Sequence, residues 1–126
     1  MHWFSIGVAL LSAFGIIVLG VMYLSNPRGA SQSFGLPLPE AGANIAWWLR
    51  LKGVRDVVSG LVVLALVAWG TPLLLGIVLL IAAMTPVGDM TLVLAAKGST
   101  KTAFSVHGLT AAVMILAAIP LIAGVA

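Results

Sequence analysis

Four long apolar stretches, separated by short polar segments, are the feature that most constrains this sequence. Only six Lys or Arg and three Asp or Glu occur among the 126 residues, so 7% of the chain is charged, whereas a soluble domain carries about 25% charged residues. A water-soluble fold with so few charges could not cover its own surface. Hydrocarbon must therefore be the solvent that most of the chain faces, and the sequence predicts an integral membrane protein.

The apolar stretches predict an all-α polytopic membrane four-helix bundle that forms a single domain over residues 1–126. The expected transmembrane spans are residues 3–25, 45–69, 72–96 and 103–125. Residues 29–43 are expected to form a loop, because Pro37 and Pro39 disfavour a helix there. Pro86 is expected to kink the third span, since proline lacks an amide N–H and clashes with the preceding turn.

The N-terminal stretch is expected to be a retained helix that ends at the breaker Asn26-Pro27-Arg28. A cleaved signal peptide fits less well, because the segment before the apolar run holds only His2 as a basic group and the run exceeds a typical signal core.

The basic residues indicate how the chain is oriented in the membrane. All six fall at one side of a four-span bundle, in or near the first and third loops: Arg28, Arg50, Lys52, Arg55, Lys97 and Lys101. Cytoplasmic loops carry an excess of Lys and Arg, so both termini are expected on the non-cytoplasmic side. We expect a multi-pass protein of the cell membrane, in a bacterial inner membrane. Nucleic acid is excluded as a partner, because dispersed basic residues form no dense patch.

Ionisable side chains on three of the expected helices lie at similar depths beneath the basic loops. Asp56, Asp89 and His107 are four, eight and six residues inward of Lys52, Lys97 and Lys101, which is about 6, 12 and 9 Å along a helix. An ionisable group in hydrocarbon costs several kcal/mol unless it is paired or hydrated. The sequence therefore predicts one polar chamber near the cytoplasmic end of an apolar bundle.

The chamber supplies candidate catalytic residues. Two carboxyl groups in unlike surroundings can divide the roles of general acid and general base, which Asp89 and Asp56 would serve. His107 would be the proton partner, and Arg55 would orient an acid or hold an oxyanion. Candidate substrate-binding residues at the same level are Tyr23, Ser59, Thr85 and Thr110.

Each candidate also has a structural interpretation that the sequence leaves open. Arg55 and Asp56 could be interfacial anchors, and Asp89 could be a structural acid that bonds a neighbouring helix. His107 could donate a hydrogen bond to a backbone carbonyl, and Tyr23 could belong to an aromatic belt.

No metal or cofactor is expected. One His and two Asp could supply ligands, but no His-x3-His or Glu-x2-His pairing occurs. Cysteine is absent, and neither a Gly-x-Ser-x-Gly elbow nor a phosphate-binding glycine loop is present.

The stretch Gly53-Val54-Arg55-Asp56-Val57-Val58-Ser59-Gly60-Leu61, followed by Asp89 and His107-Gly108, resembles a bacterial and fungal family of small four-helix membrane proteins of unknown function. The shape of that family is similar to the wider DoxX-like group. The resemblance covers nearly the whole chain. It implies a four-helix fold and points at Arg55, Asp56, Asp89 and His107, but it brings no established chemistry.

The leading functional hypothesis is a membrane-embedded enzyme that acts on a lipophilic small molecule by acid–base chemistry, through isomerisation, cyclisation or epoxide opening. Its partners would be the lipid bilayer and that molecule. One alternative is a proton-coupled transporter or efflux unit, for which a chain this short would need to form a homo-oligomer. The other is a non-catalytic membrane subunit, with the polar residues holding an assembly together.

Overall fold

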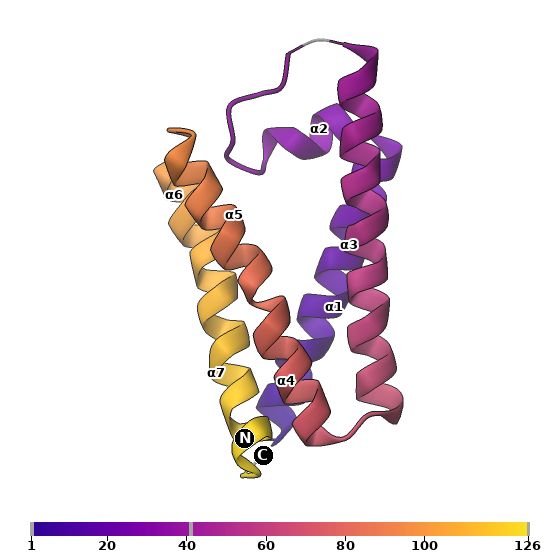
Figure 1. The fold of residues 1–126 in the computed structure, drawn as a ribbon, viewed down its shortest axis with the longest axis vertical. Coiled ribbons are helices and arrows are strands. Elements are labelled where there is room, and N and C mark those ends of the chain that lie inside the picture. Colours follow the sequence, from indigo (N-terminus) through magenta and orange to yellow (C-terminus); the bar gives the residue numbers. More distant parts are fainter. Residues whose placement is uncertain (1, 41, 126) are drawn as a thin grey trace.

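The computed structural model describes residues 2–40 and 42–125, and over these residues it is all-helical. The elements in chain order are α1 (His2–Ser25), α2 (Pro27–Gln32), α3 (Ala43–Trp69), α4 (Pro72–Ala82), α5 (Met84–Ala95), α6 (Thr100–Thr102), the π-helix η1 (Ala103–Gly108) and α7 (Leu109–Ala123). Helices α4 and α5 follow one another end to end, as do α6, η1 and α7. The fold therefore consists of long helical rods that run side by side (Figure 1).

Within the described residues, three helical stretches are long and apolar enough to cross a membrane: His2–Ser25, Pro72–Ala95 and Thr100–Ala123. Each has 24 residues, or about 36 Å of helix, against a hydrocarbon thickness of about 30 Å. Helix α3 is longer, at 27 residues, but it carries four of the charged residues. The prediction of a multi-pass, all-α membrane protein is confirmed by these stretches.

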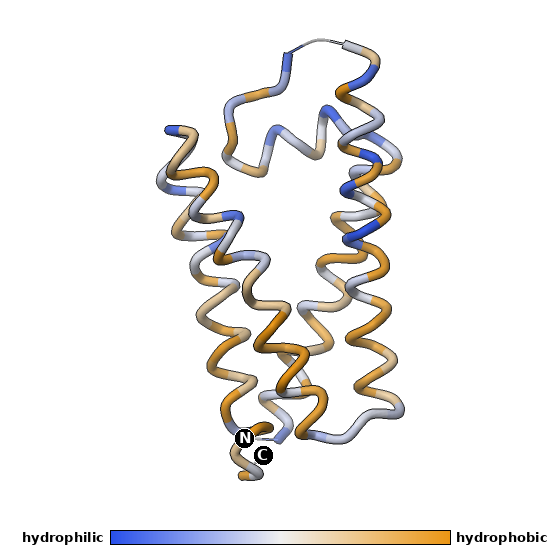
Figure 2. The backbone as a smooth tube through the Cα atoms, in the orientation of Figure 1, coloured by the Kyte–Doolittle hydropathy of each residue, from blue (hydrophilic) through white to orange (hydrophobic). Residues whose placement is uncertain are grey.

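The rods form two pairs that separate toward one end of the molecule. Helix α1 packs along α3, and α4 and α5 pack against α7 and η1. The pairs join where α1 contacts α7 and where α3 turns into α4, at the end that holds both termini. Toward α2 and α6 they diverge (Figure 1). Figure 2 shows that the joined half is almost entirely hydrophobic and that polar residues gather in the diverging half.

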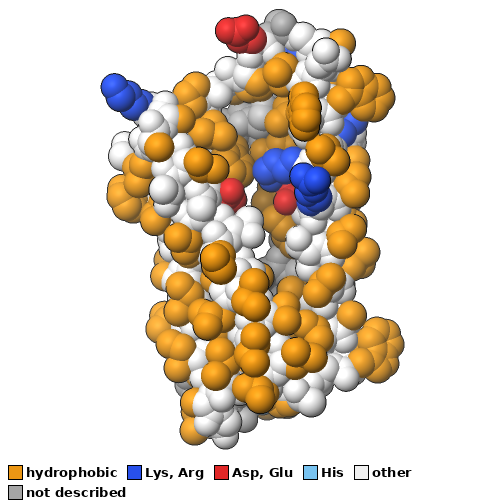
Figure 3. Space-filling view, viewed as in Figure 1, with side chains coloured by type: hydrophobic (Ala, Val, Ile, Leu, Met, Phe, Trp, Pro, Cys, Tyr) orange, Lys and Arg blue, Asp and Glu red, His pale blue; other side chains and the backbone are white. Residues whose placement is uncertain are grey.

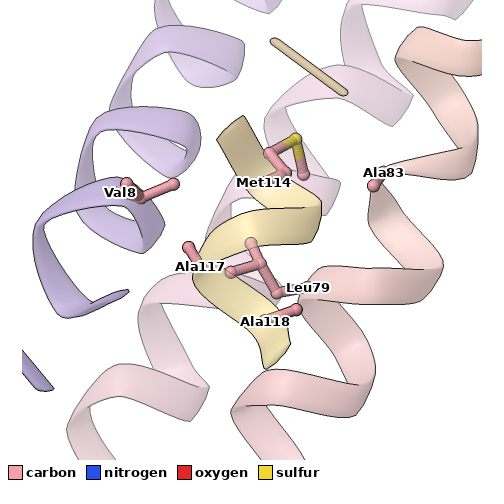
Figure 4. Packing of buried hydrophobic residues seen from close by; sticks show 6 residues of the cluster. All are labelled: Val8, Leu79, Ala83, Met114, Ala117 and Ala118. Carbon is pink, nitrogen blue, oxygen red and sulfur yellow. The ribbon is translucent and has the colours of Figure 1, made fainter. Parts of the chain in front are cut away.

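Small side chains fill the joined half. Figure 4 shows one cluster, to which α1, α4, α7 and the junction between α4 and α5 contribute Val8, Leu79, Ala83, Met114, Ala117 and Ala118. A second cluster adds Ala9, Ala13, Val63, Leu75 and Leu121. The hydroxyl of Ser5 is buried here and donates to the carbonyl of Ala117 at 2.8 Å. Alanine at these positions lets the helices approach closely, as is usual for helix packing in membranes.

Glycines make the contact between α1 and α3 closer still. A Cβ atom on Gly20 would lie 2.6 Å from the carbonyl oxygen of Gly53, and one on Gly53 would lie 2.7 Å from that of Gly20. About two helical turns further along α3, a Cβ on Gly60 would lie 2.6 Å from the carbonyl oxygen of Ala13. Backbone meets backbone at these points, so no side chain can move aside to make room.

We expect Gly20→Ala to destabilise the fold by about 1–3 kcal/mol, because the added methyl forces the two backbones apart. Gly15→Ala is the matched control on the same helix, since a Cβ there meets nothing within 4 Å. Denaturation in detergent micelles measures both variants. Equal stability of the two would contradict the close contact.

Two boundaries differ from the sequence-based prediction. Asn26-Pro27 does end α1, but it also starts α2, so the region expected to be loop begins with helix. The Asn26 side chain accepts from the amide of Gly29 at 3.2 Å, and Pro27 occupies the first turn, which are both helix-start signals. Between α4 and α5, the helix is interrupted at Ala83. The kink was expected three residues later, at Pro86.

Candidate functional site

A pocket of about 310 Å³ lies in the diverging half, between the two helix pairs. Its walls come from α1, from α2 and the connection after it, from α3 and from α5: Tyr23, Ser31, Phe34, Leu36, Pro37, Pro39, Leu49, Lys52, Asp89 and Leu92. Most of these side chains are apolar. Figure 3 shows the hollow between α5 and α3, with acidic and basic side chains at its edges. An apolar pocket with a few converging polar groups is the usual form of a small-molecule site.

On the α3 side, Lys52 and Asp56 form an ion pair. The distance from Lys52 Nζ to Asp56 Oδ2 is 2.7 Å, and the two residues are one helical turn apart. The same ammonium group lies 4.2 Å from the ring centre of Tyr23 and 5.2 Å from that of Phe34. An ammonium over aromatic faces gains further electrostatic stabilisation. Lys52 is thus fixed by a carboxylate and two rings, with Asp56 and Tyr23 buried behind it.

Asp89 lies on the α5 side of the pocket and is half-buried. Within residues 2–40 and 42–125, its carboxyl group has no hydrogen-bond or ion-pair partner within contact distance. Asp89 thus differs from Asp56, whose carboxylate is neutralised by Lys52. The two acids therefore occupy unlike surroundings, because Asp89 lines the pocket and Asp56 lies behind the lining residue Lys52.

His107 lies behind the pocket and is buried. Its Nε2 is 2.7 Å from the carbonyl oxygen of Phe34. A carbonyl oxygen can only accept, so Nε2 carries the hydrogen of this bond, and Nδ1 is an acceptor whenever the ring is neutral. The rings of His107 and Phe34 also contact one another, with centres 4.5 Å apart and planes tilted by 48°. The histidine belongs to the π-helix η1, a distortion that often occurs at functional sites.

The connection between α2 and α3 covers the pocket at the end near α6. We call residues 33–40 of this connection the strap. The strap is tied to the opposite helix pair twice, through Phe34 to His107 and through the carbonyl of Gly35, which accepts from the amide of Ser99 at 2.8 Å. Gly35 has a φ of 102°, a backbone conformation that favours glycine. The strap thus bridges the two pairs where the helices themselves diverge.

The structure separates the predicted site residues into two groups. Tyr23 and Asp89 line the pocket, and Asp56 and His107 contact its lining residues Lys52 and Phe34. The other four predicted residues are exposed and lie outside the lining: Arg55, Ser59, Thr85 and Thr110.

Two of these exposed hydroxyls bond their own helix. Ser59 donates to the carbonyl of Arg55 at 2.8 Å, and Thr110 donates to that of Val106 at 2.6 Å. Such bonds to the preceding turn satisfy the hydroxyl locally.

Lys52 and Phe34 are central to the site but were not among the predicted site residues. For Lys52 the sequence did contain an indication, because it precedes Asp56 by four residues and can pair with it on one helix face. For Phe34 the sequence contained no such indication, since this residue lies in a segment without hydrophobic periodicity. Among the described residues, no group of three or more His, Asp or Glu is placed to hold a metal ion.

The fold and the pocket define a helical multi-pass membrane protein with a small pocket between its helix pairs. The sequence model of a family described as "Domain of unknown function (DUF4267)" matches residues 13–121, and the chain belongs to this family. Comparison with curated proteins and with solved structures gives no match. Membership of a family of unknown function is thereby confirmed, whereas the bacterial and fungal range of the family and its similarity to DoxX-like proteins stay predictions.

Proposed function

We propose that this protein is a membrane-embedded enzyme that moves a proton within a lipophilic small molecule bound in the pocket. The observation that carries the proposal is the placement of Asp89, whose carboxyl group lines an apolar pocket and has no partner among the described residues. A carboxyl group that serves neither packing nor an ion pair is available to a ligand. General acid–base catalysis needs such a group within reach of the substrate.

The other residues supply complementary roles. Lys52, rather than Arg55, is the cation at the pocket, where it can hold a developing negative charge on the substrate. Asp56 and the rings of Tyr23 and Phe34 fix its position. His107 holds the strap by its Nε2 hydrogen and offers Nδ1 as a proton acceptor. Double-bond isomerisation, cyclisation and epoxide opening remain the candidate reactions. The first two need only proton movement and bond rearrangement within the substrate, whereas epoxide opening also takes up water as the nucleophile.

Transport is less well supported by the packing. A molecule transported within one chain would have to pass through the joined half, where Leu79, Ala117 and Ala118 have no exposed surface. The pocket lies in the diverging half, and the buried side chains of the joined half close its end toward the termini. A pathway would therefore require the two helix pairs to separate along their whole length.

Purified protein in detergent, incubated with a lipophilic cell extract in deuterated or oxygen-18 water, tests the proposal. We expect untargeted mass spectrometry to find a lipophilic species that gains solvent deuterium at carbon, or solvent oxygen, only when the protein is present. No ion gradient exists in detergent, so turnover there excludes obligatory proton-coupled transport. Absence of any such species would favour the transporter or the non-catalytic subunit.

We further propose that α3 is a fourth span, with both termini on the non-cytoplasmic side of a bacterial inner membrane. Helix α3 runs antiparallel to α1 and contacts it from Gly53 to Gly60. Exposed tryptophans mark both of its ends: Trp47 and Trp48 near the strap, and Trp69 near the termini. Tryptophan is enriched at both membrane interfaces, and the basic residues all lie toward the strap end.

Single cysteines test this topology, because the natural chain has none. We expect Val125→Cys to react with a membrane-impermeant maleimide in intact spheroplasts. Ala96→Cys, which is also exposed but lies at the opposite end of the bundle, should react only after permeabilisation. The reverse pattern would invert the orientation, and labelling of both in intact spheroplasts would place the two positions on the same side.

A further inference from the structure

The pocket has one side that no helix closes. Helices α1 and α3 pack together, as do α5 and η1, but α3 and α5 are not packed against one another. Leu49 of α3 and Leu92 of α5 line the pocket at this gap, and Leu92 is 62% exposed. Figure 3 shows the hollow opening to the surface between these two helices. We call this opening, between Leu49 and Leu92, the lateral mouth.

The end of the pocket toward the polar loops is covered. Phe34, Leu36, Pro37 and Pro39 of the strap form its wall there, and the strap is bound to His107 and to the amide of Ser99. A molecule arriving from water would have to break both of these hydrogen bonds. A molecule arriving through the lateral mouth would break none.

The depth of the lateral mouth places it in the bilayer. Leu92 lies five residues inward of Lys97 on a helix that is apolar enough to span a membrane, which is about 7 Å along the helix axis. Asp89 is one turn deeper. If α5 spans the bilayer with Lys97 at the headgroups, the lateral mouth faces lipid chains just beneath them, and the carboxyl group of Asp89 lies inside.

We propose that the pocket takes a membrane-resident amphiphile with one apolar chain and a hydroxyl headgroup, which enters sideways from the bilayer between α3 and α5. The hydroxyl donates to Asp89, and the chain lies against Leu49 and Leu92 with its far end in the lipid. A single chain fits, because a volume of about 310 Å³ is at the lower limit of small-molecule sites. The inference rests on the proposed function only in sharing its site.

A photoreactive probe tests the ligand class. The probe is a straight-chain primary alcohol with a diazirine in its chain, mixed with the purified protein in phosphatidylcholine liposomes; its methyl ether is the control. We expect the alcohol to label peptides that contain Leu49 or Leu92 at least tenfold more than the ether does. Equal labelling by the two, or labelling confined to other helices, would overturn the inference.

Variants of Asp89 assign the hydrogen bond. Asp89→Leu should remove the preference for the alcohol, whereas Asp89→Asn keeps an acceptor oxygen and should retain it. Thr91→Val, an exposed polar-to-apolar change on the same helix, should label like the natural protein. Preserved preference in Asp89→Leu would show that another group binds the hydroxyl.

Closing the lateral mouth tests the route. Leu49→Cys and Leu92→Cys, joined by a flexible bis-maleimide, should lower labelling at least tenfold relative to the same protein before cross-linking. Leu92→Trp, whose larger side chain fills the lateral mouth without any cross-linking reagent, should also lower labelling. Unchanged labelling in both would overturn sideways access. Labelling as expected without turnover in heavy water would instead contradict the proposed enzyme and leave this inference standing.

Discussion

Asp89→Asn is expected to lower turnover of the lipophilic substrate by about 100- to 10,000-fold, which is the usual contribution of a general acid or base. The amide has the size and shape of the carboxyl group, but it can neither accept nor release the proton. Asp89 has no partner among the described residues, so the substitution breaks no hydrogen bond or ion pair that holds the helices together. The rate of solvent deuterium or oxygen-18 incorporation in detergent is the measurement.

Two comparisons separate a chemical effect from a structural one. Thr91→Val lies on the same helix, and its exposed hydroxyl bonds only the preceding turn, so its rate should match that of the natural protein. Helix content and detergent unfolding of Asp89→Asn should also be unchanged. A rate within tenfold of the natural protein, with the fold intact, would remove Asp89 from the catalytic role.

The sequence predicted the helical rods well because hydrocarbon leaves few alternatives. A backbone in lipid must satisfy its own hydrogen bonds, so a long apolar run is a helix almost by necessity. The segment 26–32 was predicted less well, since Asn-Pro stops one helix and also provides a cap and first turn for another. The π-helix around His107 has no sequence signal of its own.

For the site, depth along a helix was predictable, whereas direction around the helix required packing. Arg55 and Asp56 are adjacent, about 100° apart around the axis, and the sequence alone did not say which faces inward. The structure shows that Asp56 shares a face with Gly53 and Gly60, which turn toward α1. The spacing of three and four residues among these positions was a usable signal, because glycines on one helix face mark a close contact.

Phe34 shows what the sequence could not supply. Its position depends on two long-range contacts, the tilted ring contact with His107 and the hydrogen bond from that ring to its carbonyl. Both join residues that are 73 positions apart. No local pattern encodes such a pairing, so the strap and the pocket beneath it became visible only in the folded chain.

Lys52→Leu is expected to destabilise the fold by about 3 kcal/mol, the lower end of the cost of breaking a buried ion pair. The change leaves the carboxylate of Asp56, whose side chain is 12% exposed, without the ammonium that lies 2.7 Å from it. We use the lower end of that range of costs because the lysine side chain is 34% exposed, so the ion pair is only partly buried. Lys101→Leu removes an exposed charge with no ion pair among the described residues, so it should change stability little.

A double-mutant cycle shows whether the loss of stability comes from breaking the interaction between Lys52 and Asp56 or from each substitution separately. Asp56→Leu leaves the ammonium group of Lys52 without its carboxylate. The double variant Lys52→Leu/Asp56→Leu leaves no unpaired charge. An apolar pair in a bundle surrounded by lipid can be as stable as the ion pair that it replaces. We therefore expect the double variant to be more stable than either single variant in detergent unfolding, while it loses turnover. Additive losses would mean that Lys52 and Asp56 act separately, and that the cation at the pocket is not positioned by its neighbour.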